Sequence, residues 1–123
     1  ADAIERLSQG ARRLAAEQAA LEKRLDAPDS DLAPTLRAVH AINERLQSWE
    51  QGWLDARGLR QRTWYRHLGV APGRWLGYGA TTFPGVTESI TLDGGQHTTD
   101  ELARLTLALE QLSALMFAVD LDR

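Results

Sequence analysis

TTDELARLTLALEQLSALMFAVDL, residues 98–121, is the stretch that decides the fold, because its apolar residues recur at helical spacing. One apolar stripe consists of Leu102, Leu105, Leu109, Leu112, Met116 and Val119. A second stripe consists of Ala103, Leu107, Ala114, Phe117 and Leu121, and its centre lies roughly 160° from the first at about 100° per residue. Such a helix needs a partner on each side. Either it lies in the middle of a bundle, or one of its sides contacts another chain or domain. Such apolar stripes more often pack within one chain.

Two further helices are predicted upstream of this stretch. The first carries apolar residues at alternating spacings of three and four from Ile4 to Leu25. The second begins near Ala33-Pro34 and carries one apolar stripe, formed by Leu36, Val39, Ile42, Leu46, Trp49 and Trp53. Pro28 and the polar residues after it predict a short turn, so the two helices are expected to be antiparallel neighbours.

Between residues 55 and 84 the helical period disappears and glycine recurs, which predicts a long loop that is ordered around its aromatic residues. A short helix is expected from Pro84 to Ile90, then a turn at Asp93-Gly94-Gly95. A capping box formed by Thr98 and Glu101 would start the last helix. The predicted fold is all-α: a single domain over residues 1–123, built as an antiparallel helical bundle with three long helices, one short helix and a long ordered Gly-rich loop.

Composition and motifs exclude several kinds of chemistry. The net charge of -3 and the scattered basic residues argue against a nucleic-acid partner, and the absence of cysteine excludes disulfides and thiolate ligands. No apolar run reaches the ~20 residues that span a bilayer, so membrane contact is not expected. The three histidines His40, His67 and His97 have no metal-ligand spacing, and no G-x-S-x-G or HExxH occurs. No catalytic or metal-binding residue is therefore assigned, and the chain is not expected to be an enzyme.

An ordered series of short motifs carries a family resemblance. Asn43-Glu44-Arg45-Leu46, Trp53-Leu54-Asp55, Gly58-Leu59 and Trp64-Tyr65-Arg66-His67 are followed by Ala71-Pro72, Gly77-Tyr78-Gly79 and Phe83-Pro84-Gly85. The series resembles the transferrin-receptor-like dimerisation domains, the C-terminal helical domains of the glutamate carboxypeptidase and transferrin receptor family. The resemblance implies a homodimer, formed by one part of a longer chain that also contains a peptidase-like domain.

The resemblance also implies which residues act in each role. Tyr78 matches a tyrosine that contacts substrate in the peptidase members, whereas Gly77 stands where a lysine would be its partner. No cofactor is expected in this domain, and zinc is expected in the peptidase domain if the longer protein is catalytic. The candidates for the dimer interface come instead from the two opposed stripes of the last helix, and they are the second-stripe residues Leu107, Ala114, Phe117 and Leu121.

Two alternatives remain open at the level of sequence. The chain could be a free-standing helical adaptor, or the dimerisation domain of a receptor-like protein without catalysis. Because Ala1 opens directly into an amphipathic helix, we expect the chain to be a piece of a longer protein. The family implies an extracytoplasmic location.

Overall fold

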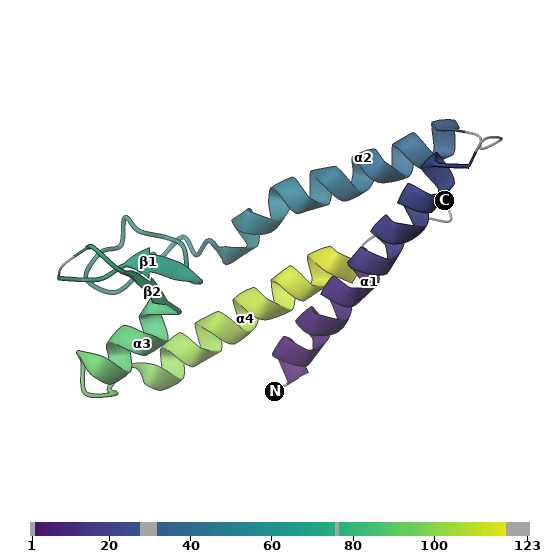
Figure 1. Cartoon of the computed structure of the whole chain (residues 1–123). Helices are drawn as coiled ribbons and strands as arrows, with labels where there is room; N and C mark the ends of the chain where they lie inside the picture. Colours follow the sequence, from purple (N-terminus) through teal and green to yellow (C-terminus); the bar gives the residue numbers. More distant parts are fainter. Residues whose placement is uncertain (1, 28–31, 76, 118–123) are drawn as a thin grey trace. The chain divides into compact units, whose positions relative to one another are not determined.

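The computed structural model describes residues 2–27, 32–75 and 77–117. The chain is mainly helical, which confirms the predicted class (Figure 1). Its elements, in chain order, are α1 Asp2–Leu25, α2 Leu32–Trp49, the 3-10 helix η1 Glu50–Trp53, β1 Val70–Pro72, β2 Ala80–Thr82, α3 Pro84–Thr91 and α4 Thr98–Phe117. No helix within these described ranges is both long and apolar enough to cross a membrane.

The chain divides into two compact units, and each is described by itself. The first unit comprises Ala1–Glu50 and Glu110–Arg123, and the second comprises Gln51–Leu109. The helix α4 begins in the second unit and ends in the first. The antiparallel bundle of three long helices therefore stays a prediction.

In the first unit, α1 and α2 run in opposite directions and contact each other (Figure 1). Their contact buries Leu21 and Ile42, which border a recess of about 180 Å³. Acidic residues in the first turn of α1 and basic residues in its last turn favour the helix, because they complement its dipole. At the end of α4, the Met116 carbonyl accepts a hydrogen bond of 3.3 Å from Arg45 Nη1. The pKa of Arg45 is lowered, chiefly by burial.

The second unit contains a small sheet that the all-α prediction missed. β1 and β2 pair antiparallel in the register Val70↔Thr82, Ala71↔Thr81, Pro72↔Ala80. Each strand has three residues, too few for an alternating pattern to stand out in the sequence. The second predicted helix also differs, because α2 ends at Trp49 and the chain tightens into η1 before the buried Trp53.

The buried cluster of the second unit is aliphatic, so the aromatic loop core expected from the sequence is wrong for Trp64, Trp75 and Tyr78. Leu59, Leu68, Ala71 and Ala108 form the buried cluster, and Tyr65 packs against it. These three side chains point to solvent instead, with exposed fractions of 77% for Trp64, 77% for Trp75 and 102% for Tyr78. The short helix expected from Pro84 is present as α3.

Candidate functional site

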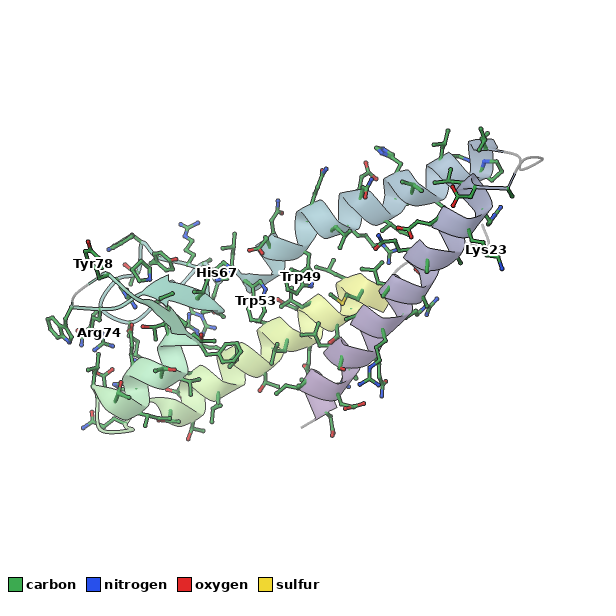
Figure 2. All side chains as sticks on the ribbon, viewed as in Figure 1. Lys23, Trp49, Trp53, His67, Arg74 and Tyr78 are labelled. Atoms are coloured by element: carbon green, nitrogen blue, oxygen red, sulfur yellow. The ribbon has the colours of Figure 1, made fainter. Side chains whose placement is uncertain are left out.

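The hairpin formed by β1 and β2 carries Tyr78 at its tip, where the phenol is fully exposed (Figure 2). Two backbone hydrogen bonds close the tip, from Gly73 N to Gly79 O at 2.9 Å and from Gly77 N to Gly73 O at 3.1 Å. Gly77 has a φ of 63°, a left-handed conformation that glycine adopts without steric cost. The hairpin therefore presents Tyr78 outward, and the phenol does not pack inside the loop.

The base of the hairpin rests on a layer of rings. Trp53 stacks on His67 with ring centroids 5.9 Å apart, and Phe83 lies 6.3 Å from Trp53 on a tilted plane. His67 Nδ1 accepts hydrogen bonds of 3.1 Å from the backbone amides of Gly69 and Val70. Nδ1 must be unprotonated to accept, so the neutral ring carries its proton on Nε2. His67 therefore has a structural role in this unit.

Beside the hairpin lies a group of four charged side chains, the hairpin cluster, formed by Arg62, Arg74, Glu88 and Asp93. Arg74 Nε donates to Glu88 Oε2 at 3.2 Å, and its two terminal nitrogens donate to Asp93 Oδ1 and Oδ2 at 2.8 and 3.1 Å. Arg62 pairs with Glu88 Oε1 and also donates to the Pro72 carbonyl at 2.6 Å. The pKa of Asp93 is lowered, chiefly by its hydrogen bonds from Arg74.

A second group, the α4 cluster, is formed by Asp55, Arg60, Glu101 and Arg104. Arg104 donates to Asp55 Oδ2 at 3.1 Å, to both Glu101 oxygens at 3.1 and 3.0 Å, and to the Gly58 carbonyl at 2.7 Å. Arg60 donates to Glu101 Oε1 at 3.0 Å. These arginines hold the Glu101 carboxylate, so it does not make the capping box expected with Thr98.

A recess of about 510 Å³ adjoins the α4 cluster and is lined in part by Arg57, Arg60 and Arg104. A row of cations in a recess suggests an anion site, but each of the three is hydrogen-bonded to a carboxylate of this chain. Because those charges are already matched, we assign no ligand to the recess.

The second apolar stripe of α4 is exposed at the three positions where the structure describes a side chain. Leu107 is 53% exposed, and Ala103 and Ala114 are also exposed. Phe117 is the last residue of α4, but its side chain is not among those described, and Leu121 lies outside the described residues. On the first stripe, Leu109 and Leu112 are buried as expected, whereas Leu102 is 47% exposed.

Sequence reasoning missed the two charged clusters. It did not link Arg74 to its partners, because Glu88 and Asp93 lie 14 and 19 residues further along the chain. No local spacing rule links residues so far apart. In the part of the chain that the structure describes, His, Asp and Glu side chains form no group of three that could hold a metal ion.

Three curated relatives show local similarity to this chain. A probable glutamate carboxypeptidase of Arthroderma benhamiae is 46% identical over 57 residues, which cover 46% of this chain and 8% of the relative. In Arabidopsis thaliana, the probable glutamate carboxypeptidase LAMP1 is 40% identical over 52 residues, which cover 42% of this chain and 8% of the relative. The probable glutamate carboxypeptidase AMP1 is 29% identical over 73 residues, which cover 58% of this chain and 10% of the relative. The chain thus matches a tenth or less of each relative.

A family model covers much more of the chain than these pairwise similarities. The model described as the transferrin receptor-like dimerisation domain matches residues 1–117. This match confirms the resemblance inferred from the motif series around Tyr78. Because it includes nearly every residue, the chain belongs to the family of transferrin receptor-like dimerisation domains.

Proposed function

We propose that this chain is the self-association module of a larger glutamate carboxypeptidase-like protein, and that its hairpin places Tyr78 in that protein's substrate cleft. The antiparallel bundle of three long helices, the extracytoplasmic location and a zinc-holding peptidase domain elsewhere in the longer protein belong to the same proposal. Family membership supports the self-association, and the names of the relatives support the kind of protein.

The observation that carries the self-association half is the exposed leucine on the second stripe of α4. Leu107 leaves 53% of its surface in water, although burying a leucine is worth about 1.5 to 3 kcal/mol. Glu110 is the neighbour three residues on, so a polar rim is available beside the apolar position. A two-fold contact through this side of α4 would bring Leu107 of each copy into the interface.

Sedimentation of the full-length protein tests this half. The wild type should be a dimer at micromolar concentration, and Leu107→Glu should weaken the dimer by on the order of thirtyfold or more, as loss of a central interface residue does. Leu102→Glu is the matched control, because Leu102 is a similarly exposed leucine of α4 on the other stripe. Equal dissociation by both variants, or by neither, would reject the second stripe as the interface.

The substrate half depends on Tyr78, whose hydroxyl projects from the hairpin with no burial of the ring. A phenol offers an apolar ring and a polar tip to a ligand. In the full-length protein, Tyr78→Phe should lower kcat/KM for peptides. The loss of transition-state stabilisation should be about 0.5 to 3 kcal/mol, the cost of one lost hydrogen bond.

The other tyrosine of the chain provides the control for this test. Tyr65→Phe also removes a phenol hydroxyl, but that hydroxyl donates to the Val70 carbonyl of the same chain, at 3.3 Å. Because Val70 is the residue of β1 farthest from the tip, Tyr65→Phe should change peptide kinetics much less than Tyr78→Phe does. Unchanged kinetics in a dimeric Tyr78→Phe protein would refute the substrate role, and a dimeric wild type that cleaves no peptide would indicate a receptor-like member of the family.

A further inference from the structure

The tip of the hairpin does not fix its own position. The aromatic side chains at the tip point into water, with Trp75 77% exposed and Tyr78 fully exposed. Around Gly77 and Gly79 there is open space, since a methyl group added at either would meet nothing within 4 Å. The orientation of the tip must therefore come from the residues that hold its base.

Two buried arginines hold that base from one side. Arg62 donates to the carbonyl of Pro72, the last residue of β1. Arg74 follows Pro72 by two residues, and its side chain is 7% exposed. Arg74 reaches Glu88 on α3 and, through a two-pronged contact, Asp93 in the turn after α3. The chain entering the tip is thus tied to α3 and to the turn that follows it.

The chemistry of this contact is directional. A guanidinium is a planar fork that matches a carboxylate in one relative orientation, so a two-pronged pair fixes angle as well as distance. Two guanidinium groups face two carboxylates in the hairpin cluster, and the charges balance. The pKa of Arg74 is raised, chiefly by its hydrogen bonds to Asp93, in accord with a cation held by its partner.

Arg74 is poorly placed to bind a substrate anion itself. Each of its three nitrogens donates to Glu88 or Asp93, and only 7% of the side chain reaches solvent. A ligand would have to compete with two carboxylates of the protein for it. Its hydrogen bonds are made to other residues of this chain, as expected of a residue that holds the hairpin in place.

We propose that Arg74 is a positioning residue: its fork on Asp93 and Glu88 sets the orientation of the hairpin tip, and so the place of Tyr78. The inference rests on the proposed role of Tyr78 in the substrate cleft. Arg62 supports the same strand end through the Pro72 carbonyl.

The test uses Arg74→Lys in the full-length protein, because lysine keeps the charge and loses the fork. Arg104→Lys is the matched control. Arg104 lies in the same unit, its side chain is 10% exposed, and it also holds two carboxylates, but it contacts no residue of the hairpin among its described hydrogen bonds. Both substitutions should destabilise the fold to a similar degree.

Two readouts separate positioning from general loss of stability. Amide hydrogen exchange at Gly73 and Gly77, which donate within the tip, should become on the order of tenfold faster in Arg74→Lys and stay near wild type in Arg104→Lys. In peptide hydrolysis, Arg74→Lys should raise KM more than it lowers kcat. It should add little to the effect of Tyr78→Phe in the double variant, because both act through one contact.

The outcomes distinguish this inference from the function on which it rests. Unchanged exchange in Arg74→Lys, or equal changes in both lysine variants, overturns the inference. Faster exchange together with unchanged kinetics in Arg74→Lys, while Tyr78→Phe is impaired, overturns the positioning role and leaves the role of Tyr78 standing. If Tyr78→Phe is unimpaired but exchange is faster in Arg74→Lys alone, the anchoring stands and the proposed substrate role fails.

Discussion

The apolar faces of two helices meet in the first unit, whereas in the second unit two clusters of charged side chains surround buried glutamates. In the first unit, Leu21 and Ile42 meet where α1 packs on α2. In the second, Glu88 and Glu101 are 4% and 2% exposed and each holds two arginines. Periodic helices can be aligned by non-directional packing. An irregular chain has no repeating face to pack, so directional ion pairs fix its course instead.

The largest expected effect comes from removing a carboxylate shared by two arginines. Glu88→Ala should lower the free energy of unfolding by about 3 to 5 kcal/mol, because it leaves Arg62 and Arg74 buried with one carboxylate fewer. Denaturant titration measures the loss. Glu44→Ala, at an exposed position of α2 in the first unit, is the control and should change stability by less than about 0.5 kcal/mol. A small loss for Glu88→Ala would show that the second unit does not depend on its ion pairs.

The next comparison uses two glycines of the second unit with left-handed backbones. Gly58 has a φ of 69° and Gly77 a φ of 63°. A Cβ at Gly58 would lie 2.0 Å from the Thr63 carbonyl oxygen, whereas one at Gly77 would meet nothing within 4 Å. Gly58→Ala should therefore cost about 2 to 4 kcal/mol, from backbone strain and overpacking together, and Gly77→Ala about 1 to 2 kcal/mol, from strain alone. Equal losses in thermal unfolding would contradict the close packing around Gly58.

A milder change tests the apolar packing of the first unit. Ile42→Val should cost about 0.5 to 1.5 kcal/mol, since it deletes one buried methylene beside an existing recess. A lower midpoint of denaturant unfolding, with an unchanged slope of free energy against denaturant concentration, would record this loss. Leu36→Val is the control, because Leu36 lies on the same helix and is 57% exposed. A loss at Ile42 as large as that at Glu88 would remove the contrast between the units.

The last prediction concerns acid. The pKa of Asp55 lies well below its usual range, chiefly because of its hydrogen bonds from Arg57. A depressed carboxyl pKa stabilises the fold above the unfolded-state value of about 3.9, and that contribution is lost as pH falls through the folded-state pKa. The unfolding midpoint should therefore drop as pH falls below about 4. Asp55→Asn should flatten this pH dependence, whereas Asp26→Asn in the first unit should not. If the two variants and the wild type have identical pH profiles, Asp55 is not a source of the dependence.

Sequence patterns identified the helices, because an amphipathic helix repeats its apolar residues over many turns. The pattern over residues 98–121 predicted α4, and Pro84 correctly predicted the start of α3. The motif series identified the family, which the match to residues 1–117 confirms. Local patterns failed in the glycine-rich stretch, where β1 and β2 are too short to repeat and three aromatic side chains point to solvent.

The sequence alone thus determined the helical class and the family. It could do so because helical periodicity and short motifs are properties of neighbouring residues. Only the tertiary structure decided that Tyr78 stands at the tip of a hairpin, and that Arg74 beneath it is bound to Glu88 and Asp93. Those partners meet because the backbone turns through α3. Ion pairing depends on distance in space. The spacing of residues along an irregular chain does not reveal that distance.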